Sequence, residues 1–172
     1  MNRPELVRRT ASEGGRAPTR PGRQVFTVRL DGALFGLPIE CVRAVLRAEA
    51  VAPAPLGPSW VIGLVNLRGH VVVAASLRAR FGLAEPARLG EPLLTVSVEI
   101  EGETLAVAVD AVGDVVDVDE SQLIATPPGM SDAVRRLTSG VYAMPAGFLP
   151  VIDLHAAFQQ KARAAVEQPL SA

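Results

Sequence analysis

Residues 63–83 read Gly-Leu-Val-Asn-Leu-Arg-Gly-His-Val-Val-Val-Ala-Ala-Ser-Leu-Arg-Ala-Arg-Phe-Gly-Leu. Two runs in this stretch, Leu64–Leu67 and Val71–Ala75, are rich in Val and Leu, which is typical of half-buried strands. Between them, Arg68-Gly69 supplies a residue that readily adopts a positive φ in a tight connection. The stretch therefore predicts a β-hairpin with a charged side chain at its tip.

A short helix is expected directly after this hairpin. Ser76 can cap it by accepting a backbone N–H bond, and Leu77 and Phe81 then share one helical face. A similar segment occurs 77 residues later in the sequence. At this offset, Gly63 aligns with Gly140, Ser76 with Asp153, Leu77 with Leu154 and Phe81 with Phe158. Two copies are too few for a solenoid, so the repeat favours two packed lobes, each a hairpin closed by a capping helix. Chance similarity between two hairpin–helix segments is the alternative.

Composition bounds the class of protein. The chain has 172 residues, 17 Lys and Arg against 18 Asp and Glu, and a formal net charge of −1. The excess of positive charge lies in residues 1–23, so the remainder is acidic, and only 4% of all residues are aromatic. An acidic body with few aromatic residues does not favour a nucleic-acid interface, which needs a basic surface and stacking platforms. A single cysteine, Cys41, excludes an intramolecular disulfide and favours a reducing compartment.

We expect a cytoplasmic protein that does not insert into a membrane. No run approaches the roughly 18 apolar residues that span a bilayer. The N-terminal residues also lack the apolar region of a secretory signal.

The order of segments predicts an all-β barrel or sandwich, because many short strands alternate with Gly- and Pro-rich turns. Residues 1–23 are expected to form a disordered arm, and residues 24–160 the folded domain. Its two lobes are expected to separate at Ala84–Glu91, which contains Pro86 and Gly90. An amphipathic helix is expected over Leu154–Val166, so residues 161–172 would be its end and a tail.

No pattern of catalytic or metal-ligating residues is present. His70 and His155 do not share a metal-binding helix face. The four aspartates of the strand-rich region match no EF-hand loop and are expected to be charges on a solvent-facing strand: Asp110, Asp114, Asp117 and Asp119. No nucleophile elbow, phosphate loop or dinucleotide motif occurs. We therefore expect no enzymatic activity, no cofactor and no metal.

Four segments together resemble the CheW coupling proteins of bacterial chemosensory arrays. That family is marked by Asn-Leu-Arg-Gly, here Asn66–Gly69, followed by an apolar strand and Asp-Leu-Arg. The other three segments are Phe35-Gly36-Leu37-Pro38-Ile39 with Val42, then Val109–Val115, then Leu149–Leu154. The resemblance extends from Gln24 to Phe158 and keeps the order and separation of the four segments.

The resemblance implies two SH3-like β-barrel lobes around a shared apolar core, with short capping helices. It also implies an adaptor that joins the cytoplasmic tip of a chemoreceptor to the regulatory domain of a histidine kinase. A groove between the lobes would take the receptor's helical hairpin, and six residues match its lining positions: Val42, Gly63, Arg68, Leu94, Val112 and Val115. Taken singly, each of these valines is equally compatible with an ordinary core position.

Departures from the family pattern occur in the second strand of the hairpin. Val73 and Ser76 stand where the family usually has Pro and Asp, and Ala74 and Ala75 replace bulkier residues. Because Ser also caps helices well, these differences indicate a divergent paralogue, such as one serving a pathway other than motility, rather than another fold. The other functional class compatible with small barrels is a nucleic-acid-binding protein.

We predict that the arm before Gln24 is dispensable for folding, because its composition cannot form a packed core. A chain that starts at Gln24 should melt within about two degrees of the full chain. Thermal denaturation of both chains measures this, and a markedly lower Tm for the shorter chain would show that the arm docks on the body.

Overall fold

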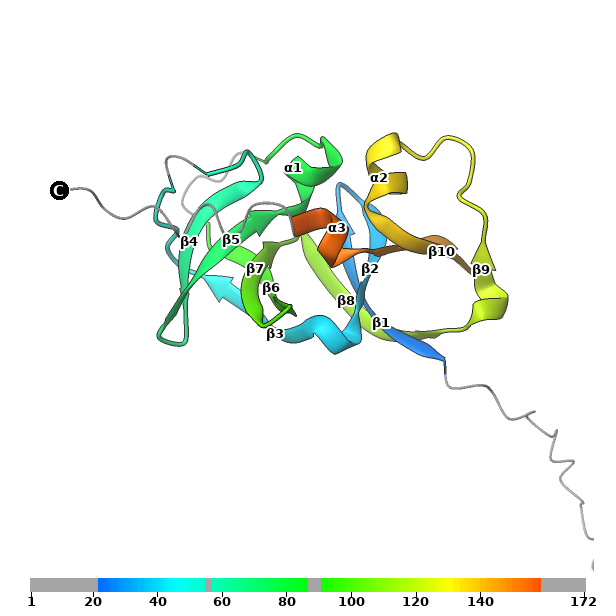
Figure 1. The fold of residues 1–172 in the computed structure, drawn as a ribbon, viewed down its shortest axis with the longest axis horizontal. Coiled ribbons are helices and arrows are strands. Elements are labelled where there is room, and N and C mark those ends of the chain that lie inside the picture. The colour runs from blue at the N-terminus through cyan, green and yellow to red at the C-terminus, as the bar shows by residue number, and fades with distance from the viewer. Residues whose placement is uncertain (1–21, 55–56, 87–90, 159–172) are drawn as a thin grey trace, which may run out of the picture.

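The computed structural model describes residues 22–54, 57–86 and 91–158. The predicted arm lies outside these residues except for Gly22 and Arg23, and the predicted tail lies outside them entirely. The fold class is confirmed: the chain is mainly β and forms two sheets side by side (Figure 1).

The first sheet has six strands. Their spatial order is β8 (Ala111–Val118), β1 (Arg23–Leu30), β2 (Ala33–Pro38), β11 (Gly147–Ile152), β10 (Thr138–Met144) and β9 (Leu123–Ile124). We call this sheet, with the elements that cover it, the six-stranded lobe.

The second sheet has five strands and forms the five-stranded lobe. Their order is β3 (Val42–Ala48), β6 (Leu93–Ile100), β7 (Glu103–Ala108), β5 (His70–Ser76) and β4 (Val61–Leu67). Its outer strands β3 and β4 contact each other, so the sheet curls into a small barrel. Short helices complete the fold: α1 (Leu77–Phe81), α2 (Asp132–Arg136), α3 (Leu154–Phe158) and the 3₁₀ turns η1 (Ile39–Cys41) and η2 (Glu120–Gln122).

The predicted hairpin and its helix cap are confirmed. Arg68 and Gly69 form the turn between β4 and β5 with φ values of 53° and 90°, as a tight two-residue hairpin turn requires. The Asn66 side chain closes this turn by accepting the Gly69 N–H at 2.8 Å. Ser76 accepts the Ala79 N–H at 3.0 Å and begins α1.

The duplication also extends to backbone detail. β10, β11 and α3 repeat β4, β5 and α1 at the offset of 77 residues, and both hairpins carry a bulge at the equivalent place. Asp153 accepts the Ala156 N–H as Ser76 accepts that of Ala79. Similarly, β6 and β7 repeat β1 and β2, and their turns, Asp31-Gly32 and Glu101-Gly102, have positive φ throughout.

Each repeat gives its later strands to the sheet begun by the other repeat. β3 follows the β1–β2 hairpin but pairs with β6, whereas β8 follows the β6–β7 hairpin but pairs with β1. Each sheet therefore combines the first hairpin of one repeat with the later strands of the other. The chain crosses between sheets after β2 and after β7.

The expected lobe boundary at residues 84–91 is consequently wrong. β5 and β6, on either side of this segment, belong to the same five-stranded sheet. The segment separates the two sequence repeats, not the two lobes. Pro and Gly indicate a loop, but they do not indicate which sheet the next strand joins.

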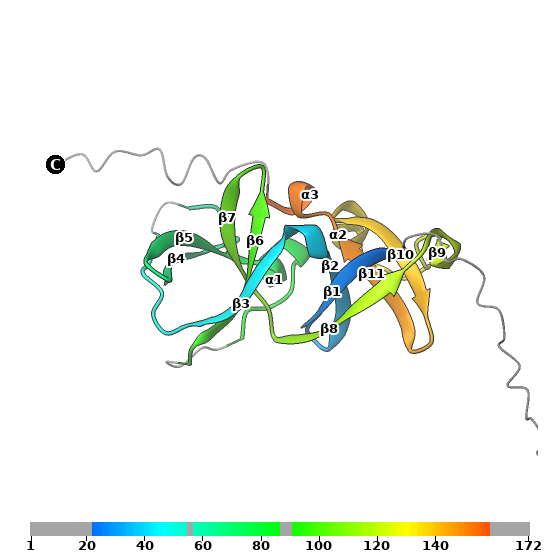
Figure 2. The ribbon, with the colours of Figure 1, turned by 90° about the horizontal axis from the view of Figure 1, so that it is seen from below.

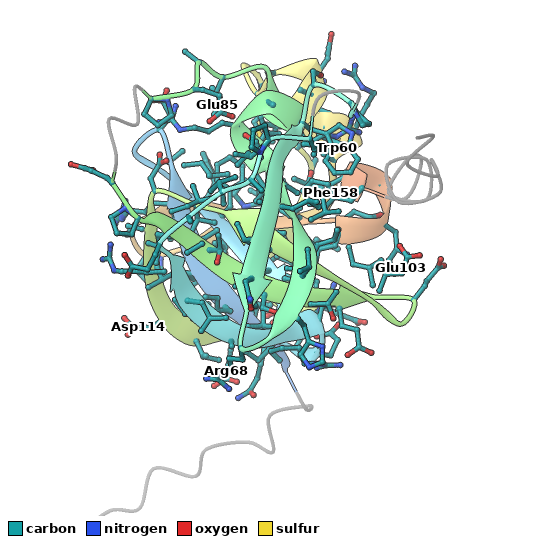
Figure 3. All side chains as sticks on the ribbon, turned by 90° about the vertical axis from the view of Figure 1, so that its left-hand side faces the viewer. Trp60, Arg68, Glu85, Glu103, Asp114 and Phe158 are labelled. Carbon is teal, nitrogen blue, oxygen red and sulfur yellow. The ribbon has the colours of Figure 1, made fainter. Side chains whose placement is uncertain are left out.

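One hydrophobic core joins the lobes, while smaller clusters fill each lobe. Phe35 of β2 stacks on Phe81 of α1, with ring centroids 5.0 Å apart. Trp60, which precedes β4, packs against Phe158 of α3 at 5.3 Å (Figure 3). Both ring pairs connect elements of different lobes, so the shared core that the resemblance implied is present.

Two strands depart from simple alternation. β5 is buried on both faces, because Ala74 faces the interior of the five-stranded lobe and Ala75 the shared core. In β1, Val25 and Thr27 are buried together with Val28, and Val25 packs in the cluster within the six-stranded lobe whereas Val28 packs in the shared core. The predicted final helix starts at Leu154 as expected. It extends to Phe158, and the remaining residues of the predicted helix lie outside the described part of the chain.

We predict that Gly63 and its repeat equivalent Gly140 respond differently to substitution by Ala. A Cβ at Gly63 would clash with the carbonyl oxygen of Ala52, which is fixed by a hydrogen bond from the Leu64 N–H. A Cβ at Gly140 would press on the end of the exposed Leu123 side chain and would otherwise touch the Tyr142 ring at ordinary contact distance. Gly63→Ala should lower the free energy of unfolding by about 1–3 kcal/mol, and Gly140→Ala by less than ~0.5 kcal/mol. Chemical denaturation measures both, and equal losses would contradict this account.

Candidate partner-binding surface

The two exchanged strands are the terminal strands of their sheets and lie on one side of the molecule. β3 ends the five-stranded sheet and β8 ends the six-stranded sheet. Both lie along the lower side of the molecule in Figure 1 and face the viewer in Figure 2. Three exposed valines lie on them, Val45 on β3 and Val112 and Val115 on β8.

A bulge places the two valines of β8 on one face. Residues three apart on a regular strand lie on opposite faces. Here Val115 pairs with Phe26 and Val112 with Val28, so β8 has one extra residue between the two pairs. Because Phe26 and Val28 lie two apart and both contact the shared core, Val112 and Val115 lie on the face of the sheet that carries this core.

The extra residue is accommodated by a close contact between β1 and β8. The Thr27 hydroxyl donates to the carbonyl oxygen of Asp114 at 2.8 Å. A Cβ at Gly113 would clash with that hydroxyl. Glycine at this position therefore lets the bulge form against the buried Thr27.

β3 has a matching bulge with a matching effect. Val42 pairs with Val98 and Val45 with Val96, and one extra residue of β3 lies between the pairs. Val96 and Val98 belong to the shared core, so Val42 and Val45 lie on its side of the sheet. Five residues thus lie on the faces of the two sheets that carry the shared core, and we call them the apolar rim: Val42, Val45, Leu94, Val112 and Val115.

The family resemblance had assigned four of these rim residues to the predicted groove, but not Val45. Leu94 is partly buried against the shared core, and its carbonyl oxygen accepts the Val109 N–H at 3.1 Å, just before β8 begins. Val42 and Val45 lie three residues apart, a spacing that is compatible with a helical turn or a strand, so the spacing alone does not assign Val45 to a face.

Gly63 lies apart from the rim. It pairs with Ala74, which faces the interior of the five-stranded lobe. The backbone around Ala52 covers Gly63 and leaves no space for a side chain. Its observed role is therefore close contact within the fold.

Arg68 is exposed at the end of the β4–β5 hairpin, opposite the end where Trp60 lies (Figure 3). Among the described residues, no hydrogen bond or ion pair engages its side chain. It borders a shallow cavity of ≈ 250 Å³ with Ala44 and Leu46 of β3. These two residues alternate with the rim valines, so Arg68 and the rim lie on opposite sides of the edge strand β3.

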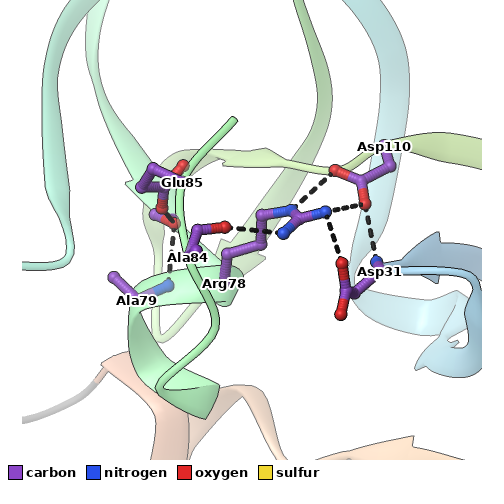
Figure 4. A network of polar contacts seen from close by, with 7 residues as sticks. Asp31, Arg78, Ala79, Ala84, Glu85 and Asp110 are labelled. Carbon is purple, nitrogen blue, oxygen red and sulfur yellow. Dashed lines mark hydrogen bonds and ion pairs between the residues drawn. The ribbon is translucent and has the colours of Figure 1, made fainter. Parts of the chain in front are cut away.

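In contrast to Arg68, the Arg78 side chain forms hydrogen bonds to several groups within the fold. Its guanidinium makes a two-pronged contact with the Asp110 carboxylate at 3.0 and 2.9 Å. It also donates to Asp31 at 3.1 Å and to the carbonyl oxygen of Ala84 at 2.6 Å (Figure 4). The hydrogen bond to Asp110 raises the pKa of the Arg78 side chain. We call Arg78, Asp31 and Asp110 the arginine clasp.

Asp110 therefore corrects one expectation about the aspartates, because it lies between β7 and β8 rather than on a strand and, although exposed, is ion-paired with Arg78. Asp114 is exposed as expected. Asp117 is also exposed but accepts a hydrogen bond from Gln24 at 3.1 Å. Asp119 caps η2, and the hydrogen bond from Ser121 lowers the pKa of its carboxyl group.

In the described part of the chain, the remaining cysteine and histidine side chains do not gather into a cluster. Burial raises the pKa of the Cys41 thiol. His155 lies 3.7 Å from a carboxylate oxygen of Glu101, and both side chains are exposed. Within the described ranges, no three His, Cys, Asp or Glu side chains gather as metal ligands, and no helix there has the length and hydropathy to cross a membrane.

Comparisons with known proteins agree with this architecture. The chain is 27% identical over 150 residues to the chemotaxis protein CheW of Rhizobium meliloti (strain 1021), covering 86% of this chain and 94% of that protein. It is 31% identical over 128 residues to protein FrzA of Myxococcus xanthus, covering 74% and 79%. The crystal structure of the scaffolding protein TtCheW from Thermoanaerobacter tengcongensis superposes with a TM-score of 0.70 at 26% identity, covering 81% of this chain and 94% of that one.

The family described as the CheW-like domain matches residues 24–164. This match begins at the second residue of β1 and includes both sequence repeats and all the later described strands. The chain belongs to the CheW-like domain family.

Proposed function

We propose that this protein is a non-enzymatic adaptor that couples chemoreceptor cytoplasmic tips to a histidine kinase in a chemosensory array. Membership of the CheW-like domain family supports the general role of a chemotaxis coupling adaptor. The observation that carries the receptor contact is the apolar rim, where two edge strands from different lobes present valines beside one shared core. The adaptor works in the cytoplasm and needs no cofactor.

The rim fits a helical partner. An amphipathic helix binds by placing apolar side chains at spacings of three and four residues against an apolar surface. Val45, Val112 and Val115 provide such contacts. Arg68 lies beyond β3 and has no partner among the described residues, and its planar, permanently charged fork can form two parallel hydrogen bonds to a carboxylate of the partner. A receptor helix that crosses β3 would contact the rim valines on one side of this strand and Arg68 on the other.

The kinase contact is proposed from the family resemblance alone. The partner is the regulatory domain of a histidine kinase, and it would bind at a surface different from the rim so that both partners are held together. Micromolar affinity suits this role, because a ~1 μM dissociation constant is about 8 kcal/mol and allows assembly by many weak contacts.

A nucleic-acid-binding barrel is not favoured by the observed surface. Single-strand binders need aromatic platforms along a basic groove. Within the described residues, the large exposed apolar side chains include one aromatic, Phe148. The exposed edge strand β8 carries aspartates rather than basic residues.

The bridging function is tested with three purified components: this protein, a receptor cytoplasmic fragment and a kinase regulatory domain from the same cell. Analytical ultracentrifugation should show the receptor fragment and the kinase domain in one complex only when the adaptor is present. If the adaptor binds neither component at high micromolar concentration, the proposal is wrong.

We predict that Val115 contributes to receptor binding, whereas an equally exposed residue outside the rim does not. Val115 and Leu123 have exposed fractions of 48% and 49%. Val115→Ala should weaken binding of the receptor fragment about fivefold, roughly 1 kcal/mol for the apolar surface lost. Leu123→Ala is the matched control and should leave the affinity unchanged. Isothermal titration calorimetry measures both, and equal effects would refute the rim.

We predict that two residues of one turn have separate roles. Arg68→Ala should weaken receptor binding by roughly 1.5–3 kcal/mol, the scale of a hydrogen bond to a charged group, with little change in Tm because no side chain in the described part of the chain pairs with Arg68. Asn66→Ala should lower the stability by about 1 kcal/mol, because it removes the bond that closes the turn. Arg68→Lys should restore only part of the binding, since it lacks the fork. A destabilised Arg68→Ala protein with normal receptor affinity would contradict this assignment.

A further inference from the structure

The arginine clasp lies where the chain crosses from the five-stranded to the six-stranded lobe. Asp110 occupies the crossover between β7 and β8. Arg78 comes from α1, which directly follows β5 of the five-stranded lobe, and Asp31 forms the turn of the β1–β2 hairpin in the six-stranded lobe. The clasp therefore joins three segments that are far apart in sequence (Figure 4).

Asp110 is the centre of these contacts. Besides the two bonds from Arg78, its carboxylate accepts the Asp31 N–H at 2.7 Å. Its own N–H donates to the carbonyl oxygen of Arg29 at 3.0 Å. The Arg78 side chain is 13% exposed and that of Asp110 27%, so this ion pair is shielded from solvent more than the exposed pair Arg43–Glu99, with 49% and 41%.

The crossover leads directly into the apolar rim. Val109, one residue before Asp110, is hydrogen-bonded to Leu94, and Val112 follows two residues after Asp110. β8 has a neighbouring strand on one side only, and its pairing with β1 is interrupted by the bulge. Among the described residues, the backbone at the start of β8 is therefore held by its pairing with β1 and by the hydrogen bonds of Val109 and Asp110, with no strand on its other side.

We propose that Arg78 is a positioning residue for the apolar rim: by holding Asp110 and Asp31, it fixes the β7–β8 crossover and sets Val112 and Val115 against Leu94. A planar guanidinium suits this task, because one side chain binds the two carboxylates and a backbone carbonyl in a single geometry. The link to receptor binding rests on the proposed function, whereas the effect on β8 does not.

The first measurement is residue-resolved amide hydrogen exchange by NMR on the full chain. In Arg78→Met, protection of residues 111–116 should fall about tenfold, while protection in the β10–β11 ladder stays near that of the unaltered protein. A uniform fall in both strands would show that Arg78 only stabilises the whole fold, and unchanged protection in β8 would show that the clasp holds nothing. Either result overturns the proposal.

Matched variants keep the test sharp. Asp110→Asn should lower the amide protection of β8 by a similar amount. The double variant Arg78→Met/Asp110→Asn should lower it little further, because each substitution already removes the same Arg78–Asp110 contact. Arg78→Lys should give an intermediate loss and serves if Arg78→Met fails to fold. Arg135→Met, on the exposed helix α2, is the control and should leave β8 unchanged. Additive effects of Arg78→Met and Asp110→Asn would contradict the clasp.

The second measurement is receptor affinity well below the Tm, where each variant is folded. Arg78→Met should bind the receptor fragment about five- to tenfold more weakly, with Arg135→Met unaffected. Loss of β8 protection with unchanged receptor affinity would support the clasp and refute the rim as the receptor site. The failures of the two proposals are thus distinguishable.

Discussion

The exchange of strands between the two repeats is the constraint on which the rest of the structure depends. The β1–β2 hairpin is completed by β8 and β11, which come from the second repeat, and the β6–β7 hairpin by β3 and β5, which come from the first. Neither repeat can form a sheet with a covered face by itself. The lobes must therefore fold together, and the core between them is obligatory. The ring pairs Phe35–Phe81 and Trp60–Phe158 reinforce this, because each connects elements of different lobes.

The partner-binding surface follows from the same constraint. β3 and β8 are the strands that leave one lobe for the other, and each becomes a sheet edge. Each carries one extra residue, and in both cases the bulge aligns valines on the side of the shared core. Exposed edges tend to pair with other chains, and charged side chains oppose such pairing. Arg43 and Arg47 on β3 and Asp114 and Asp117 on β8 are charges of this kind, so the edges can offer apolar contacts to a partner helix without inviting strand addition.

Local features were predictable from the sequence, and long-range ones were not. The β4–β5 turn and the Ser76 cap depend on neighbouring residues, so the sequence specified both. The strand exchange is different, because hydrophobic periodicity indicates which face of a strand is buried but not which sheet the strand joins. The bulge in β8 is also invisible to periodicity, since Val112 and Val115 are spaced as residues on opposite faces. Only the family resemblance grouped them, and the geometry that unites them emerges from the register with β1.

Two arginines near the β4–β5 hairpin differ in role: one is available to bind a partner, and the other holds segments of the fold in place. Arg78 donates to three internal acceptors, so its hydrogen-bonding capacity is largely used within the fold. Arg68 has no internal partner among the described residues and is solvated, so its donors are available to another molecule. Because a partner must displace that water, the net affinity gained from Arg68 is smaller than its new bonds alone would give, and the same bonds fix orientation and choice of partner. The valines of the rim carry no such penalty on burial, since removing apolar surface from water is favourable. In the proposed complex, the valines would together contribute affinity without directional preference, and the directional hydrogen bonds of Arg68 would determine how the partner helix is oriented on the rim.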